Sequence, residues 1–458
     1  MSPGGTQGLD QGVMVNIARP LLTGTVLKGS ASALAVKFAA AIAGFAMFAL
    51  SSRYMEPASF GSLAIIFNAM SFLAVVSLCG QETLIIRSWE EYRGSDRPAL
   101  ARGALTFGIQ VTAAAALAMA MGVALAWLAW DRGVSTALVV AASTYLFAYS
   151  IMQFSGQFTR VAAGLASAEI PRDLMWRLIV VATIAVHHVL RIDFDATDFF
   201  LASAGALAVA LVLQLWLVAP MIPPAVREAE PQYDVRAWIP RSFKMWLSAL
   251  LDTTSQYLEV VVIGFFLGPT AAGFYFIATR ITAVFAMIAG SISLYAMPQI
   301  SNLFYSDGKR ELQAILRSLA VISAILVGLA FLLVVVAGKL LLWAFGSVYI
   351  SAYPALVVLA AGASLGALVG PAAHLLLLTG HEGAYPRIVA SALIVRFLLI
   401  AVLGPTLGLM GAALAWSIST ILMAAALIVA CRRLVGIDPS LGFALTSTRM
   451  AQLKGETP

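Results

Sequence analysis

Long apolar runs alternate with short polar connections along this chain, and the pattern predicts helices that cross a bilayer. A spanning helix needs about 20 mostly apolar residues. No segment shows the alternation over roughly ten residues that is typical of a membrane barrel strand. Lipid offers no partners to open backbone groups, so we expect an all-α polytopic membrane protein. The twelve predicted spans lie near residues 31–50, 62–86, 101–130, 135–160, 173–190, 198–219, 243–267, 274–301, 312–337, 354–380, 386–404 and 411–431.

One polar stretch divides the twelve spans into two sets of six. It reads PMIPPAVREAEPQYDVRAWIPR over residues 220–241 and is too rich in proline and charge to cross a membrane. We therefore predict a linker between two six-helix lobes, preceded by a leader and followed by a tail. The expected boundaries are 1–30 for the leader, 31–219 for the N-lobe, 220–242 for the linker, 243–432 for the C-lobe and 433–458 for the tail.

Composition and charge support this interpretation and set the orientation. The chain is 61% hydrophobic and only 11% charged, where soluble proteins carry about 25% charged residues. Nineteen of the 28 Lys and Arg residues fall in connections on the side of the N-terminus, four on the opposite side and five inside spans. Positive charge stays cytoplasmic, so both termini are expected inside. Orientation alone accounts for the net charge of +6, and no nucleic-acid partner is expected.

A repeated corner indicates that the two sets of spans are copies of one another. YMEPASFGSLA (residues 54–64) and LGPTAAGFYFI (267–277) both place a Pro four residues before a Gly, at an offset of 212 residues. Later, AEIPRDLM (168–175) matches GAYPRIVA (383–390) at an offset of 215. Because each copy has an even number of spans, the copies enter from the same side as parallel repeats. Such paired bundles usually enclose a cavity at the midplane and alternate its access, which favours a transporter.

The seventh span carries a polar stripe on one face. Its main members are Asp252, Gln256 and Glu259, and Ser248 and Ser255 share the helical spacing. One interpretation is that the stripe packs against another helix and forms hydrogen bonds there. The other is that it faces a hydrated cavity, where the two acids suit the coupling of transport to a proton or cation gradient. We take Asp252, Gln256 and Glu259 as candidate ion-coupling groups.

Several deep basic residues are candidate partners for an anionic substrate. Charges inside a span are costly and indicate function by default. Arg280 and Glu259 lie at similar depth, so a structural ion pair between them is an alternative. Asn68 is the repeat mate of Arg280. Arg396 lies near the expected midplane, and Arg177 lies closer to a span end, where it can also snorkel. We expect a cationic cavity formed by Arg280, Arg396, Arg177 and Asn68.

The run YLEVVVIGFFLGPTAAGFYFIATRI, residues 257–281, resembles the polysaccharide transporter family of Wzx-type oligosaccharide flippases. That family belongs to the multidrug/oligosaccharidyl-lipid/polysaccharide (MOP) superfamily. The shared features are an acid before Ile-Gly, then Leu-Gly, a turn, Gly-x-Tyr and Ala-x-Arg. Here the acid is Glu259 where the family commonly has Asp, and Val260 stands where a basic residue is often found. RYMEPASFGSLA, residues 53–64, is similar to the family's first corner.

The resemblance implies a V-shaped, MOP flippase-like bundle that moves undecaprenyl-pyrophosphate-linked oligosaccharide from the cytoplasmic to the periplasmic leaflet. Such transport serves exopolysaccharide, capsule or O-antigen synthesis, by alternating access coupled to an ion gradient. The implied location is the bacterial inner membrane, with polysaccharide polymerase and chain-length proteins as candidate partners. No catalytic residue, metal or cofactor is expected. The alternatives are a multidrug or small-solute exporter of the same superfamily, a membrane polysaccharide polymerase or ligase, and a passive scaffold.

Overall fold

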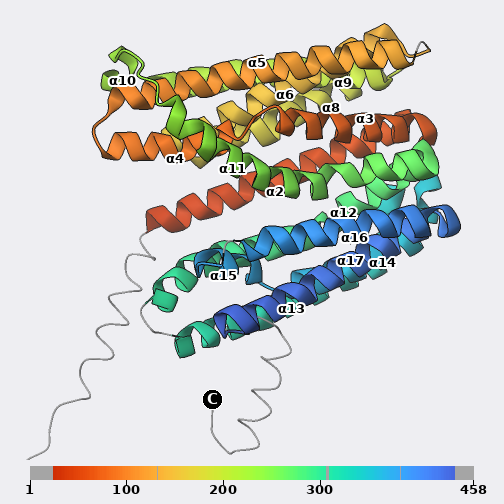
Figure 1. Cartoon of the computed structure of the whole chain (residues 1–458). Coiled ribbons are helices and arrows are strands. Elements are labelled where there is room, and N and C mark those ends of the chain that lie inside the picture. Colours follow the sequence, from red (N-terminus) through yellow and green to blue (C-terminus); the bar gives the residue numbers. More distant parts are fainter. Residues whose placement is uncertain (1–23, 132, 306–308, 382, 439–458) are drawn as a thin grey trace, which may run out of the picture. The chain divides into compact units, whose positions relative to one another are not determined.

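A computed structural model describes residues 24–131, 133–305, 309–381 and 383–438 of the chain (Figure 1). Nearly all of these residues are helical, and none of them belongs to a strand. The expected all-α class is therefore confirmed. Residues 1–23 of the predicted leader and 439–458 of the predicted tail lie outside the described residues.

Eleven helical stretches among the described residues are long and apolar enough to cross a membrane. The longest, Val235–Met297, has 63 residues and contains two of the twelve predicted spans. Gly268 separates these two spans with φ 83° and ψ 170°, so the chain turns there although the helix assignment continues. A residue before proline avoids helical backbone, and the positive φ is a conformation that glycine adopts at no steric cost. The chain is thus a multi-pass helical membrane protein.

The helices before the predicted linker follow the expected order with added breaks. They are α2 (Gly24–Tyr54), α3 (Pro57–Val76), α4 (Gln81–Gly94), α5 (Pro98–Trp130), α6 (Thr136–Ala163), α7 (Leu165–Glu169), the π-helical η1 (Ile170–Met175), α8 (Trp176–Leu190), α9 (Ala196–Val218), the short η2 (Ala219–Met221) and α10 (Pro224–Glu228).

The helices after the linker form the second series. They are α11 (Val235–Thr253), the π-helical η3 (Thr254–Leu258), α12 (Glu259–Tyr305), α13 (Lys309–Trp343), η4 (Ser347–Ala352), α14 (Tyr353–Ala367), α15 (Ala372–Leu378), α16 (Ala384–Leu407), α17 (Leu409–Ala430) and the π-helical η5 (Cys431–Val435).

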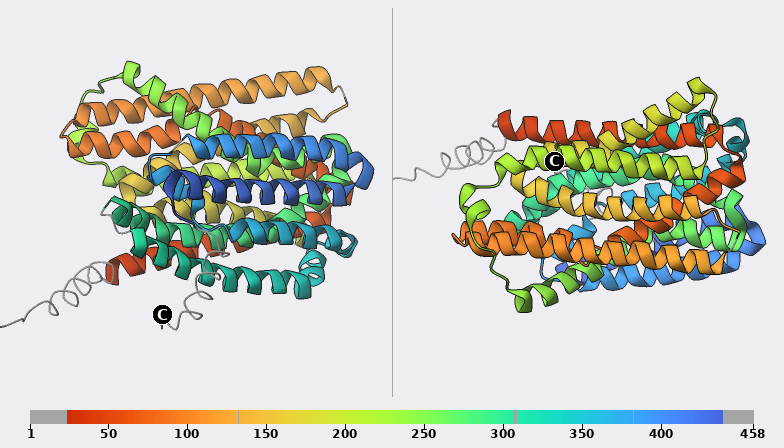
Figure 2. Two further views of the ribbon diagram at one scale, coloured as in Figure 1. Left: turned by 60° about the horizontal axis from the view of Figure 1, so that its bottom comes forward. Right: turned by 90° about the horizontal axis from the view of Figure 1, so that it is seen from above.

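The chain forms two compact units. Among the described residues, the first comprises those within 24–47, 77–192 and 197–243, and the second those within 48–76, 193–196 and 244–438. Within each unit the long helices run alongside one another in the views of Figure 2. In the first unit α6 packs on α4 and α5, and Trp89 meets the edge of Phe158 with ring centroids 5.0 Å apart. In the second unit α17 packs between α14 and α16. The predicted lobe boundaries remain a prediction.

Two predicted spans differ from the structure for local reasons. The second, expected to continue to residue 86, breaks after Val76, where Cys79 and Gly80 both adopt positive φ and α4 then starts anew. The fifth, expected from residue 173, begins at Leu165 and passes through Pro171. Proline cannot donate the usual backbone hydrogen bond and clashes with the preceding turn, and the π-helical turn η1 accommodates it.

The linker is docked on the first unit. Trp238 is completely buried, and its indole N–H donates to the Tyr92 hydroxyl of α4 at 2.8 Å. The backbone N–H of Gln232 donates to the backbone carbonyl of Ala99 at 3.0 Å. A Cβ on Gly103 of α5 would lie 1.7 Å from the Gln232 carbonyl oxygen, so only glycine allows this approach. These contacts were not expected from the sequence.

The repeated corners meet inside the second unit. Gly61 of α3 lies against the α12 corner so closely that a Cβ on it would stand 1.9 Å from the Pro269 carbonyl oxygen. A Cβ on Gly273 would stand 3.0 Å from the Gly61 Cα atom. Position 61 therefore requires glycine because the two backbones approach closely there. The two copies of the corner are therefore in direct contact.

Candidate functional site

The second unit contains a cavity of about 540 Å³. Helices α3, α12, α14 and α17 and the segment around η3 contribute its walls. Small residues open the α14 side, because Ala363, Gly366 and Ala367 present little side chain there. A cavity of this size falls within the range of small-molecule sites, about 300–1,000 Å³.

The polar stripe of the seventh span reaches this cavity. Asp252, Ser255, Gln256 and Glu259 line it, whereas Ser248 lines a neighbouring cavity of about 430 Å³ together with Asp252. The π-helical turn η3 spans Thr254–Leu258 and is wider than an α-helical turn. Such π-bulges occur frequently at functional sites. It lets the adjacent residues Ser255 and Gln256 both face the cavity. Asp252 and Gln256 are exposed, and the Tyr385 hydroxyl donates to Asp252 at 3.4 Å.

Glu259 is buried in an ion pair with Arg396 of α16. The Glu259 carboxylate also accepts a hydrogen bond from the Tyr275 hydroxyl at 3.0 Å. Both ion-pair side chains are nearly inaccessible, with 4% of the Arg396 side chain and 6% of the Glu259 side chain exposed. The stripe thus combines both interpretations of its sequence: Glu259 is tied to another helix, while Asp252 and Gln256 face open space.

Arg396 connects three helices through its fixed fork of donors. Its Nε donates to Ser419 at 2.8 Å, and its Nη2 donates to Thr420 at 3.1 Å. Its Nη1 donates to Ser255 at 3.2 Å as well as to Glu259. A guanidinium with these partners is fully engaged, as a buried charge requires. Arg396 therefore lies behind the cavity lining, and its partners Ser255, Glu259 and Thr420 form the surface.

Arg280 and Asn68, the repeat mates, line the same cavity. The Arg280 guanidinium is half-buried and lies over the rings of Phe276 at 4.5 Å and Phe48 at 5.6 Å. Asn68 donates its amide to the Ala64 carbonyl at 2.7 Å, and its Oδ1 is buried with no hydrogen-bond partner among the described residues. That oxygen is an acceptor that a ligand group or water can satisfy.

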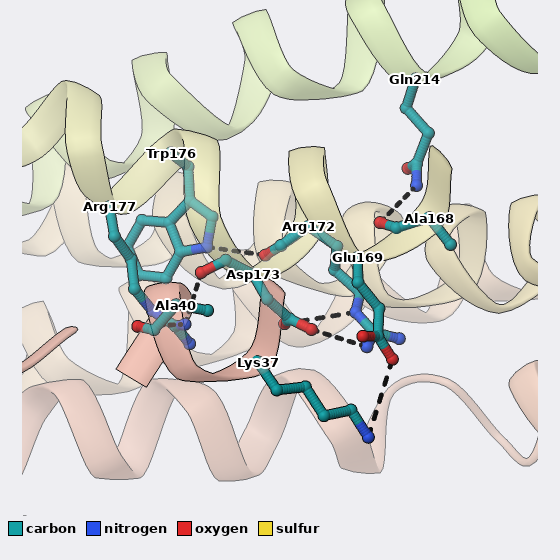
Figure 3. A network of polar contacts seen from close by, with 9 residues as sticks. All are labelled: Lys37, Ala40, Ala168, Glu169, Arg172, Asp173, Trp176, Arg177 and Gln214. Carbon is teal, nitrogen blue, oxygen red and sulfur yellow. Dashed lines mark hydrogen bonds and ion pairs between the residues drawn. The ribbon is translucent and has the colours of Figure 1, made fainter. Parts of the chain in front are cut away.

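Arg177, the remaining predicted residue, belongs to the first unit. It lies on α8 directly after η1 and donates to the backbone carbonyls of Asp173 and Ala40, the latter at 3.3 Å (Figure 3). Its guanidinium lies 5.2 Å from the Trp176 ring.

Sequence reasoning missed several groups of the cavity. Tyr275, Ser419 and Thr420 complete the shell of the Glu259–Arg396 pair, and Trp416 lies 5.5 Å from the Arg396 guanidinium. The run Trp416 to Thr420, WSIST, was the available signal, because it places three hydroxyls in an otherwise apolar span. Among the described residues, no group of three His, Cys, Asp or Glu side chains is arranged to hold a metal.

Comparison with solved structures places the fold. A multidrug resistance MATE family transporter in an inward-facing conformation matches 92% of this chain and 96% of its own at a TM-score of 0.67 and 13% identity. The lipid II flippase MurJ in an inward closed conformation matches 87% and 86% at 0.66 and 12%. A MOP superfamily transporter from Pyrococcus furiosus matches 89% and 94% at 0.61 and 12%. At these identities the likeness concerns the fold alone.

Sequence comparison places the family. The probable flippase AglR of Haloferax volcanii is 32% identical over 71 residues, which are 16% of this chain and 15% of that protein. The match thus spans a small part of this relative's length. The model of the family described as polysaccharide biosynthesis protein matches residues 26–304. The chain therefore belongs to the polysaccharide biosynthesis protein family.

Proposed function

We propose that this protein moves polyprenyl-pyrophosphate-linked oligosaccharide, with undecaprenyl as the lipid, from the cytoplasmic to the periplasmic leaflet by alternating access. The cargo would serve exopolysaccharide, capsule or O-antigen synthesis. The proposal includes a bacterial inner-membrane location with both termini cytoplasmic. It also includes the division into lobes 31–219 and 243–432, and contacts with polymerase and chain-length proteins.

The observation that carries the proposal is a guanidinium on the wall of a cavity between membrane-spanning helices. The polar side chains of Asn68 and Gln256 line the same cavity. Arg280 lines this cavity from the apolar helix that follows the corner at Gly268. A guanidinium is permanently charged, and its fork of donors matches the oxygens of phosphate groups. We assign Arg280 to the pyrophosphate, Asn68 to a hydroxyl or amide of the sugar, and Arg177 to the headgroup as it passes the first unit.

Arg396 contributes to this site through Glu259. While the pair is intact, Glu259 neutralises the charge of Arg396. Arg280 then supplies the positive charge of the cavity wall. A cation bound by Asp252 or Glu259, with Gln256 supplying an amide oxygen, would weaken the hold of Glu259 on Arg396. The guanidinium would then be available to an anionic headgroup. In this way binding of the coupling ion favours binding of the cargo, and by linkage the cargo favours binding of the ion by the same factor.

The experiment that tests the function is lipid analysis of a strain that lacks the protein. We expect a pyrophosphate-linked oligosaccharide to accumulate on the cytoplasmic leaflet, and its sugars then identify the cargo. Accumulation on the periplasmic leaflet would instead indicate a polymerase or ligase. Unchanged lipids together with altered drug tolerance would indicate an exporter. Loss of lipid flipping in a variant that still assembles its complex would separate the flippase from a passive scaffold.

A further inference from the structure

The first unit contains a second charged cluster, which the cavity of the second unit does not explain. It consists of Lys37 on α2 and Glu169, Arg172 and Asp173 at the break between α7 and η1 (Figure 3). The spans predicted from the sequence leave residues 161–172 in a connection, so Glu169 was not expected to be a charge within a helix. In the structure it is the last residue of α7, on a stretch that is long and apolar enough to span.

Glu169 is the most buried charge of this cluster. Its side chain is 2% exposed, and its Oε1 lies 3.8 Å from the Lys37 ammonium, at the outer limit of an ion pair. Its Oε2 is buried and has no hydrogen-bond partner among the described residues. The other charged or titratable groups around this break are Arg172 and Asp173 of η1, Tyr149 of α6, and Arg177 of α8, which donates to the Asp173 carbonyl. The carboxylate is therefore neutralised but poorly satisfied.

The two basic residues differ in how firmly they are held. Arg172 donates twice to Asp173, at 2.8 Å and 3.3 Å, and only 12% of its side chain is exposed. Its stem crosses Gly156 of α6, where a Cβ would stand 2.5 Å from the Arg172 Cδ atom. Lys37, in contrast, makes one long contact, and 46% of its side chain is exposed. Of the two cations, Lys37 is the one that can leave.

We propose that Glu169 is a cation-exchange site at which a sodium ion or a proton replaces the ammonium of Lys37. The released ammonium then binds the phosphate of the anionic cargo. The inference rests on the proposed function, since it adds to that function a second coupling group in the first unit. Charge balance supports the exchange: Lys37 and Arg172 neutralise Glu169 and Asp173, so Lys37 leaves at low cost only if another cation takes its place. No covalent bond changes in the exchange.

The test measures binding of inorganic pyrophosphate to the purified full-length protein in lipid nanodiscs, by calorimetry at constant ionic strength. In the wild type we expect sodium in place of choline at pH 8, or pH 6 in place of pH 8, to tighten binding by roughly 5-fold or more. Glu169→Gln frees Lys37 permanently, so its binding should be tight in every condition. Lys37→Gln should bind weakly in every condition, and the double variant should behave like Lys37→Gln.

Matched controls separate this exchange from a general effect of removing charge. Glu82→Gln removes another buried carboxylate of the same unit, whose Oε2 also lacks a partner among the described residues. In the sodium comparison at pH 8 it should keep the wild-type response. Lys339→Gln, which removes the span lysine over Tyr353 in the other unit, should do the same.

Two outcomes overturn the exchange. One is a Glu169→Gln protein that binds pyrophosphate with the wild-type dependence on sodium and pH. If that variant does not fold, the second is a Lys37→Gln protein that still shows tighter binding in sodium. In either case a wild type that binds pyrophosphate leaves the flippase proposal standing. If the wild-type protein binds no pyrophosphate and the deletion strain accumulates no lipid-linked cargo, both the cation exchange and the flippase proposal are overturned.

Discussion

Arg396 of α16 and Glu259 of α12 form an ion pair that is almost closed to solvent and also joins α17 through Ser419 and Thr420. Removing one member of a buried pair leaves the other as an uncompensated charge, which costs about 3–5 kcal/mol. We therefore expect Arg396→Ala to lower the free energy of unfolding by this amount, measured by thermal or denaturant unfolding in detergent. Arg396→Lys keeps the charge but not the fork of donors, and should recover part of the loss.

Arg387 supplies the control on the same helix. It is exposed, and its Nε donates only to the Gly383 carbonyl one turn earlier. Arg387→Ala should change stability by less than about 0.5 kcal/mol, the usual range for exposed positions. Equal stability of the Arg396→Ala and Arg387→Ala proteins would contradict the buried pair.

Gly61 and Gly273 give a prediction about the repeated corner. Gly61→Ala places a Cβ 1.9 Å from the Pro269 carbonyl oxygen, so the backbones of α3 and α12 must separate. Overpacking of this kind usually costs about 1–3 kcal/mol, and a lower melting temperature should report it. Gly290→Ala is the matched control. Gly290 also lies on α12, and a Cβ at this position would have no neighbouring atom within 4 Å among the described residues. That variant should be neutral, or more stable by about 0.5–1 kcal/mol.

The spans, the corner and the polar stripe could be predicted because each depends on local pattern. An apolar run of bilayer length has one stable form in lipid, and Pro and Gly mark a turn by their own backbone geometry. The partner of Glu259 could not be predicted in this way. Depth along a helix placed Arg280 and Glu259 at the same level, but the structure gives Glu259 to Arg396, which is 137 residues away.

The helix breaks were also beyond sequence pattern. Pro171 was placed in the connection before the fifth span, which was expected to start at residue 173. In the structure the helix begins earlier, and the π-helical turn η1 absorbs the proline, while Gln214 of α9 donates to the Ala168 carbonyl at 3.2 Å. Such tertiary hydrogen bonds decide whether a proline ends a helix or lies within it, and a single sequence does not contain them.

Asp252 should affect coupling without affecting stability. Its carboxylate is exposed to the cavity and accepts one long hydrogen bond from Tyr385. We expect Asp252→Asn to unfold within about 0.5 kcal/mol of the wild type, while its transport in proteoliposomes responds less to an imposed proton or sodium gradient. Glu56→Gln, at an exposed acid outside the cavity, is the control. If Asp252→Asn and Glu259→Gln both keep the full gradient response, the coupling role of the stripe is wrong.

Arg280 should affect transport much more than folding. Its guanidinium is half-buried over Phe276 and Phe48, contacts worth about 0.5–2 kcal/mol, so Arg280→Ala should remain folded. A hydrogen bond to a charged group contributes about 1.5–3 kcal/mol, so loss of the phosphate partner should reduce glycan export roughly 10- to 100-fold. Arg280→Lys keeps the charge, and we expect intermediate export, whereas Lys339→Ala should export normally. Wild-type export by Arg280→Ala at equal protein level would remove the cationic wall from the model of cargo binding.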